Sequence, residues 1–190
     1  MIAALVLAAG ASTRMGEPKA LLRTADGRRF VDLIGDSARQ GGCGGVLIVV
    51  APPHGDSVRA ALPAGVATAW NSQPERGMLS SVQAGLAALP RSVTAALVWP
   101  VDIPFVAAAT VRAIVDAMPG RFVVPLFDGR GGHPLRIPCG YFEEVMALDP
   151  ARGLKALLDA HRDQVERLPV EDRNVLVDVD TPDDYARTRA

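Results

Sequence analysis

A segment of small residues with two cations follows the first apolar run of the chain. It is Leu7-Ala8-Ala9-Gly10-Ala11-Ser12-Thr13-Arg14-Met15-Gly16-Glu17-Pro18-Lys19. Small side chains let backbone N–H groups come close to an anion, and Arg14 and Lys19 could neutralise charge that develops on a transferred phosphoryl group. The alternative is a loop in which Gly10 merely turns the chain. The glycine combined with both cations favours a phosphate-binding loop.

Carboxylates that could bind a metal ion occur at two later places. Asp102 directly follows the apolar run 95–99 and lies between two prolines, which hold its backbone extended. Mg²⁺ prefers hard oxygen ligands, often one or two carboxylates plus substrate phosphates, so Asp102 is the first candidate ligand. Asp178 and Asp180 lie on one side of an extended segment. Either could supply a second carboxylate, and we favour Asp180.

The common nucleotide-binding motifs do not fit this loop. The dinucleotide fingerprint needs glycine at the second and fifth positions after Gly10, where the chain has Ser12 and Met15. A P-loop needs glycine at the fifth position after Gly10 and lysine at the sixth, where the chain has Met15 and Gly16. A nicotinamide-dependent oxidoreductase is therefore disfavoured. No Cys–His or Ser–His pattern indicates a covalent nucleophile.

Short apolar runs, typical of buried strands, alternate with stretches of helical periodicity. Strands are predicted at residues 2–7, 46–50, 95–99, 122–125, 165–168 and 175–177. Helices are predicted at 31–40, 57–62, 80–89, 107–118, 141–148 and 152–161, and after Thr181, an N-cap followed by Pro182. We therefore predict one α/β domain over residues 1–190, a Rossmann-like three-layer sandwich. Its sheet is mostly parallel, with a small antiparallel excursion at the turn 128–132, and its ligand site lies at the carboxyl ends of the strands.

The composition excludes several other classes of function. The 190 residues carry 20 Lys+Arg against 21 Asp+Glu, so nothing indicates binding to nucleic acid or to a membrane surface. The apolar start lacks a basic leader and is too short for a membrane span, so we expect a cytoplasmic protein. Cys43 and Cys139 are predicted to be buried, reduced thiols. His54 and His161 belong to no recognisable motif and are predicted to be surface residues.

The first loop resembles the signature L-A-[AG]-G-x-S-x-R-M-G-x-x-K of the MobA-like nucleotidyltransferases, and within them most closely the molybdenum cofactor cytidylyltransferases. The resemblance implies a fold like that of the nucleotide-diphospho-sugar transferases. It also implies that Arg14 and Lys19 hold the phosphates of an NTP, and that Leu7, Ala8, Ala9 and Gly10 line the nucleotide. Members that use GTP tend to carry L-A-G-G and those that use CTP L-A-A-G, so Ala9 favours CTP.

Further segments extend the resemblance over essentially the whole chain. Asn71 and the stretch Gly77-Met78-Leu79-Ser80-Ser81 resemble the segment that packs against base and ribose, with Ser80 or Ser81 opening a helix. Asp102 matches the metal aspartate of the family. The Gly-His-Pro element at His133 implies contact with the pterin or its phosphate, although a purely structural histidine is the alternative. The ending Asp178-Val179-Asp180-Thr181-Pro182-Asp183-Asp184 matches too, although a capped helix start explains its last four residues.

The activity implied is transfer of CMP from CTP to the phosphate of the molybdopterin-bound molybdenum cofactor, with Mg²⁺ and release of pyrophosphate. A molybdenum hydroxylase or its accessory proteins would be the partner that receives the product. One stretch departs from the family, because Asp149-Pro150-Ala151-Arg152-Gly153-Leu154-Lys155 stands where many members have G-D-x-G-A-R. GTP or another phosphorylated acceptor, or a non-catalytic protein that delivers a nucleotide or cofactor, are the alternatives.

Overall fold

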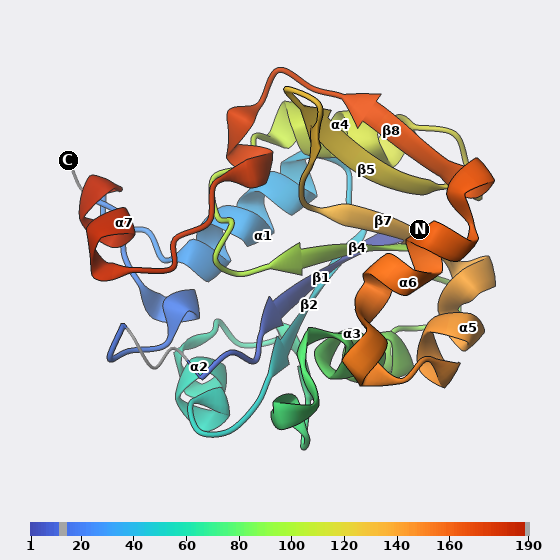
Figure 1. The fold of residues 1–190 in the computed structure, drawn as a ribbon. Helices are drawn as coiled ribbons and strands as arrows, with labels where there is room; N and C mark the ends of the chain where they lie inside the picture. Colours follow the sequence, from blue (N-terminus) through green and yellow to red (C-terminus); the bar gives the residue numbers. More distant parts are fainter. Residues whose placement is uncertain (12–14, 189–190) are drawn as a thin grey trace.

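A computed structural model describes residues 1–11 and 15–188 of the chain. Within these residues the strands are β1 (Ile2–Ala8), β2 (Gly45–Val50), β3 (Ala67–Trp70), β4 (Ala95–Pro100), β5 (Phe122–Phe127), β6 (Arg130–Gly131), β7 (Leu135–Pro138) and β8 (Val165–Pro169). The helices are α1 (Phe30–Gln40), α2 (Gly55–Ala61), α3 (Met78–Ala88), α4 (Ala108–Asp116), α5 (Phe142–Ala147), α6 (Gly153–Ala160) and α7 (Pro182–Arg187). Figure 1 shows their arrangement around one twisted sheet.

The sheet is parallel over its first half and mixed over its second. The strand order is β3-β2-β1-β4-β7-β5-β6, and β8 pairs with β5. The pairs β2–β3, β1–β2, β1–β4 and β5–β8 are parallel, whereas β7 runs antiparallel to β4 and β5. The short β6 returns antiparallel to β5 through the turn that the sequence predicted. The predicted parallel sheet with an antiparallel excursion is therefore confirmed.

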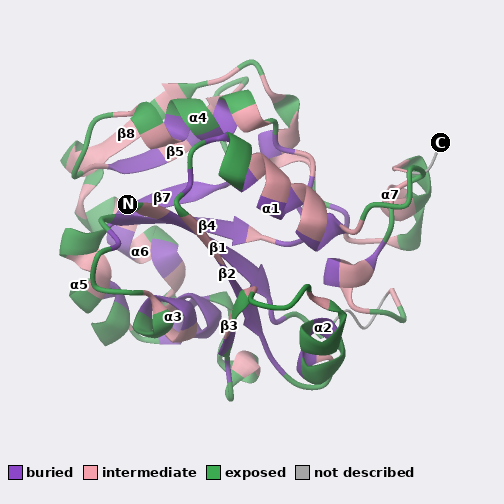
Figure 2. Ribbon diagram, turned by 180° about the vertical axis from the view of Figure 1, so that it is seen from behind, coloured by how far each residue is buried: buried purple, intermediate pink, exposed green. Residues whose placement is uncertain are grey.

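Helices cover both faces of the sheet and give three layers (Figure 2). Alternate residues of β1 face opposite cores: Val6 packs with α1, α2 and α4, and Leu5 packs with α3, α5 and α6. This alternation explains why the strand is apolar throughout. Gly85 lets α3 come close to the sheet, because a Cβ at this position would lie 2.3 Å from a methyl carbon of Leu5.

Two local predictions differ from the structure. The segment 175–177 was predicted as a strand, but Val175 and Leu176 belong to the 3₁₀ helix Arg173–Leu176. Asp172 accepts a hydrogen bond from the Asn174 N–H at 3.0 Å and so favours a turn over an extended chain. The strand β3, which is short and rich in alanine, was also missed, whereas β7 supplies the strand expected after the turn 128–132.

Arg136 in β7 is buried, with 2% of its surface exposed, and caps the end of α4. Its Nη1 donates to the carbonyl oxygens of Ile114 at 2.8 Å and Ala117 at 3.0 Å, and its Nη2 donates to the carbonyl of Met118. A helix end leaves such carbonyls without partners inside the helix. Burial lowers the pKa of Arg136, and the nearby Glu166 carboxylate raises it. Arg136 thus supplies the charge that the negative end of α4 favours.

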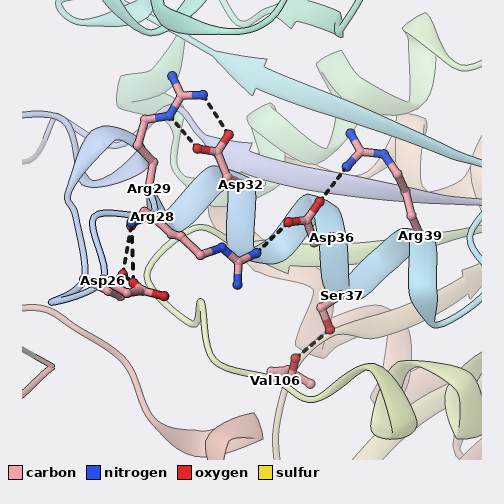
Figure 3. Close-up of polar contacts among 9 residues, drawn as sticks. Asp26, Arg28, Arg29, Asp32, Asp36, Ser37, Arg39 and Val106 are labelled. Carbon is pink, nitrogen blue, oxygen red and sulfur yellow. Dashed lines mark hydrogen bonds and ion pairs between the residues drawn. The ribbon is translucent and has the colours of Figure 1, made fainter.

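Ion pairs lie along the outer face of α1 (Figure 3). Arg29 forms a two-pronged pair with Asp32, with N–O distances of 2.6 and 2.7 Å, and Arg28 and Arg39 both contact Asp36. The two exposed pairs of Asp36 contribute little stability each, about 0–1 kcal/mol. On the inner side, the Ser37 hydroxyl donates to the carbonyl of Val106 at 2.6 Å and ties α1 to the segment before α4.

The segment after β8 is held at several points by contacts with distant parts of the chain. Asp172 accepts hydrogen bonds from the Ala107 N–H and the Thr110 hydroxyl, at 2.8 and 2.9 Å. Thr181 caps α7 as predicted and forms a capping box with Asp184. The Tyr185 hydroxyl both donates to and accepts from the backbone of Arg23. Within the described residues, no helix has the length and apolar character needed to cross a membrane.

The two cysteines differ in exposure. Cys43 is buried, and burial raises the pKa of its thiol to about 12. Cys139 is exposed at the end of β7, so the prediction of two buried thiols is wrong for this residue. Because the thiolate is the reactive form, a thiol reagent at neutral pH is expected to label Cys139 quickly and Cys43 only after unfolding. Peptide mass spectrometry, with Cys139→Ser as the control, checks this. Fast labelling of Cys43 in the native protein would contradict it.

Candidate active site

A cavity of about 410 Å³ opens at the carboxyl ends of β1 and β4. These two strands are adjacent and parallel, so the loops that follow them meet at one edge of the sheet. The lining residues are Leu7, Ala8, Ala9, Gly10, Met15, Pro18, Lys19, Ala20, Pro74, Gly77, Met78, Ser81, Pro100, Val101, Asp102 and Asp180. The four residues predicted to line a nucleotide, at positions 7–10, therefore share one cavity with Lys19 and both predicted metal ligands.

Lys19 lies between the two carboxylates. Its Nζ is 3.4 Å from Asp102 Oδ2 and donates a second, short hydrogen bond to Asp180 Oδ1. The three residues come from different parts of the chain: the 3₁₀ helix Lys19–Leu21, the loop after β4, and the segment before α7. The side chain of Lys19 is 16% exposed, so its charge is largely enclosed by its partners and the cavity wall. Among the described residues, the site thus combines the Lys19 ammonium with two carboxylates at the edge of an open cavity.

Backbone hydrogen bonds place the two aspartates side by side. The Val179 N–H donates to the carbonyl of Asp102 at 2.8 Å, so the residue next to Asp180 is tied to the loop after β4. The Trp99 indole N–H donates to the carbonyl of Ile103 at 2.8 Å, which ties the loop after β4 to the end of that strand. Asp178, the alternative second carboxylate, is exposed and does not line the cavity.

The electrostatics of Asp102 combine burial with two nearby charges. Burial raises the pKa of its carboxyl above the usual 3.8, the Lys19 ammonium lowers it, and the Asp180 carboxylate raises it. The net shift is upward, so a proton competes for this carboxylate at higher pH than for an exposed aspartate. A second cation close to both carboxylates would favour their ionised forms.

The donor set fits a hard divalent cation. Asp102 and Asp180 offer carboxylate oxygens into the cavity, and among residues 1–11 and 15–188 no group of three or more His, Cys, Asp or Glu side chains could enclose a metal. Mg²⁺ is commonly held by one or two carboxylates and completes its shell with water and substrate phosphates. Among the described residues, neither cysteine nor histidine lines this cavity, which disfavours zinc.

Asn71 organises the other wall of the cavity. It is buried, with 4% of its surface exposed, and its Nδ2 donates to the hydroxyls of Ser80 and Ser81, both at 2.9 Å. Ser81 lines the cavity, whereas Asn71 lies behind it. The helix does not open at either serine as predicted: α3 begins at Met78, because Gly77, with φ of 94°, lets the chain turn into the helix. Nucleotide contact by Asn71 and Ser81 stays a prediction.

His133 lies outside the lining of the cavity. Its backbone N–H donates to the carbonyl of Val175 at 2.9 Å, and its side-chain Nδ1 is buried and has no hydrogen-bond partner among the residues that the structure describes. Burial lowers the pKa of His133, while a hydrogen bond to the backbone of Val98 and the charge of Asp102 raise it. The residue therefore lies close enough to Asp102 to sense its charge. Contact with a substrate stays a prediction.

The other two histidines, predicted to be surface residues, each have a polar partner. A ring nitrogen of His54 is 3.1 Å from the carbonyl of Ala11, and His161 contacts the Glu144 carboxylate at 2.9 Å. His161 also packs against Tyr141, with ring centroids 4.9 Å apart. Both residues are half-buried. Arg14, predicted to bind phosphate, lies outside the described residues.

The sequence motifs did not indicate the wall made by Pro18, Pro74 and Val101. These side chains carry no reactive group, so no pattern of chemistry distinguishes them. Met15 and Met78 were quoted only as letters of motifs, yet both line the cavity, and Met78 is 50% exposed. Soft, unbranched methionine side chains adapt to flat ligands, which suits the mouth of a binding cavity.

Comparison with known proteins agrees with this geometry. The structure is similar to Rv0371c from Mycobacterium tuberculosis H37Rv, with 33% identity, a TM-score of 0.85, and coverage of 98% of this chain and 96% of that one. For a complex of Rv0371c with manganese the identity is 31% and the TM-score 0.81, over 98% of this chain and 97% of that one. Molybdopterin-guanine dinucleotide biosynthesis protein A from Archaeoglobus fulgidus, at 18% identity, shares the fold with a TM-score of 0.71, over 100% and 97% of the chains.

The sheet order and the place of the cavity define the class of nucleotide-diphospho-sugar transferase folds. The family model of the MobA-like NTP transferase domain matches residues 4–165. The chain therefore belongs to the MobA-like NTP transferase family. A search of curated proteins gave no significant match.

Proposed function

We propose that this chain transfers CMP from CTP to the phosphate of a molybdopterin-type cofactor and releases pyrophosphate. The observation that carries the proposal is the meeting of Lys19, Asp102 and Asp180 in the cavity lined by residues 7–10. Family membership supports nucleotidyl transfer. The choice of CTP and of the pterin acceptor rests on the sequence resemblance.

The residues suit a displacement that needs no protein nucleophile. The acceptor phosphate would form a P–O bond to the α-phosphorus in line while the bond to the β-phosphate breaks. Lys19 would hold phosphate oxygens, and the backbone of Ala9 and Gly10 would face the triphosphate. Asp102 and Asp180 would hold Mg²⁺, which neutralises phosphate charge when bound. Catalysis would then consist of positioning and charge neutralisation.

Ala9 is the residue that would select the base. Its side chain is buried at 8% exposure, yet the residue lines the cavity. One methyl group discriminates between ligands by only about 10- to 200-fold, so Ala9 would favour CTP without strictly excluding GTP. In the variant Ala9→Gly the ratio of CTP to GTP turnover is expected to fall. An unchanged ratio would show that another residue makes the choice.

The first test is a thermal-shift panel with CTP, GTP, ATP and NAD⁺, each with and without Mg²⁺. A ligand at about 100 times its Kd stabilises the folded protein by about 2.7 kcal/mol, which is readily measured as a rise in Tm. A Mg²⁺-dependent shift that is largest for CTP, followed by formation of a cytosine dinucleotide from a molybdopterin-type cofactor, is expected. A larger GTP shift would assign guanylyl transfer, and binding without turnover would assign an accessory protein.

The same proposal includes the compartment of the reaction and the protein that receives its product. A cytosine dinucleotide made in the cytoplasm would pass to a molybdenum hydroxylase, directly or through an accessory protein. Co-purification of this chain with such an enzyme, before and after loading with CTP, tests that step.

A further inference from the structure

The lysine of the site occupies the place that a divalent cation would need. Lys19 Nζ contacts one oxygen of Asp102 and one of Asp180. The same two carboxylates are the oxygen donors that the cavity offers to a metal ion. Positive charges repel strongly at such short separations in a partly enclosed site. An ammonium and a divalent cation therefore cannot both be held closely by these oxygens.

The backbone around Lys19 is fixed, whereas the side chain has room to move. Ala20 and Leu22 are buried, at 2% and 1% exposure, and the Leu21 N–H donates to the carbonyl of Pro18 at 2.9 Å. Lysine carries its charge on a flexible stem of four carbons. Lys19 and Gly10 line the same cavity, so rotations of the side chain can turn the ammonium from the carboxylates towards a ligand at the loop.

We propose that Lys19 is an internal counter-ion that a divalent cation must displace from Asp102 and Asp180, and that the triphosphate of the incoming nucleotide takes up the displaced ammonium. The second half rests on the proposed function. A metal ion alone then binds weakly, because only molecules in which Lys19 has left the two carboxylates can bind it. Metal and nucleotide each favour the displaced state, so each strengthens the binding of the other.

The test measures binding of Mn²⁺ alone, by electron paramagnetic resonance, without nucleotide and at about pH 8, where carboxylates are ionised. Lys19→Met removes the ammonium and keeps the length of the side chain. It is expected to bind Mn²⁺ at least about 10-fold more tightly than the wild type, the gain that follows if no more than about a tenth of wild-type molecules have the lysine displaced. Equal or weaker binding by the folded variant would overturn the proposal.

The chain offers a matched control. Lys155 is the second of two lysines in the sequence and is exposed on α6, outside the lining of the cavity. Lys155→Met makes the same change of charge and should leave Mn²⁺ affinity unchanged. An equal gain in both variants would show a general effect of net charge and would also overturn the proposal. Adding Asp102→Asn to Lys19→Met should abolish the gain, which places the ion at these carboxylates.

A measurement on the wild type covers the case in which Lys19→Met does not fold. With two lysines, selective labelling of lysine with ¹⁵N gives two side-chain ammonium signals in NMR spectra. Titration with Mg²⁺ should shift or broaden the Lys19 signal and leave the Lys155 signal in place. A Lys19 signal unchanged at saturating Mg²⁺ would overturn the proposal.

Failure of the proposed function gives a different result. If the chain does not bind nucleotides, the wild type shows no thermal shift with any NTP, while the Mn²⁺ measurement still decides whether Lys19 competes with the metal. If the function holds and the counter-ion role fails, CTP binds but Lys19→Met gains no Mn²⁺ affinity. For the coupling itself, CTP should strengthen Mg²⁺-dependent binding in the wild type and much less in Lys19→Met.

Discussion

Asp102→Asn is expected to lower nucleotidyl transfer at least about 100-fold, comparable to the loss of one preorganised group that stabilises a transition state. Asparagine keeps the shape of the side chain but removes one of the two carboxylates in the cavity. Steady-state kcat with CTP and Mg²⁺ measures the loss. Because Asp102 holds the backbone of Val179 through its carbonyl oxygen, which the substitution leaves in place, the fold should persist.

Asp178→Asn is the matched control for this prediction. It makes the same change two residues from Asp180 at an exposed position outside the cavity, and it should leave kcat within about twofold, as a surface substitution typically does. Near-wild-type turnover by a folded Asp102→Asn protein would contradict the assignment of Asp102. A large loss in Asp178→Asn would contradict the choice of Asp180 over Asp178.

The same aspartate should limit metal binding on the acid side. The carboxylate, not the protonated acid, binds the cation, and burial raises the pKa of Asp102 above the usual 3.8. Metal affinity and turnover are therefore expected to fall as the pH drops through this raised pKa, before an exposed aspartate would be protonated.

Arg136→Met is expected to lower the free energy of unfolding by about 3 kcal/mol or more, because it removes one partner of a buried group of charges. The guanidinium is lost from the carbonyl oxygens of Ile114 and Ala117 at the end of α4. The buried Oε2 of Glu166, which has no hydrogen-bond partner within residues 1–11 and 15–188, also loses the nearby positive charge. Urea unfolding followed by circular dichroism gives the difference.

Arg167→Met is the control for the stability measurement. It makes the same substitution at an exposed position of β8, where surface changes usually stay within about 0.5 kcal/mol. A loss below about 1 kcal/mol for Arg136→Met would mean that other groups satisfy the end of α4. Glu166→Gln in the Arg136→Met background should recover part of the loss, because it removes the buried charge left behind.

The sequence was sufficient for the order of most elements. Apolar runs without alternation predicted β1, β2 and β4, and both faces of these strands are indeed covered by helices. Thr181 and Pro182 predicted the start of α7 because they satisfy the first N–H groups of a helix locally. Signals of this kind depend on neighbours in the sequence and are therefore visible without the fold.

What could not be predicted depends on contacts between distant residues. The burial of Arg136 in β7 could not be predicted, because its partners at the end of α4 are supplied by the tertiary structure. The apolar residues near Val175 suggested a strand, yet Val175 meets His133 through one backbone hydrogen bond, while Asp172 bends the chain before it. In both places a side chain that satisfies backbone groups overrides local propensity.

In the candidate site too, the sequence predicted the residue types but not the contacts between distant residues. The residue types and the strand ends predicted that Lys19, Asp102 and Asp180 belong together, and all three line the cavity. Their ion pairs join residues 83 and 161 positions apart, which no local pattern specifies. The exposure of Cys139 and the partner of His161 likewise follow from the placement of β7 and α6.

The held C-terminal segment has a practical consequence for how the chain is divided. The matched family domain ends at residue 165, but Asp180 and the Val179 N–H that braces Asp102 lie beyond that border. A protein shortened to the domain border would lose one carboxylate and the brace of the other, together with the Asp172 contacts at the start of α4. Bulky fusion partners behind α7 would lie only a few residues from the chemistry, so tags for purification belong at the other terminus.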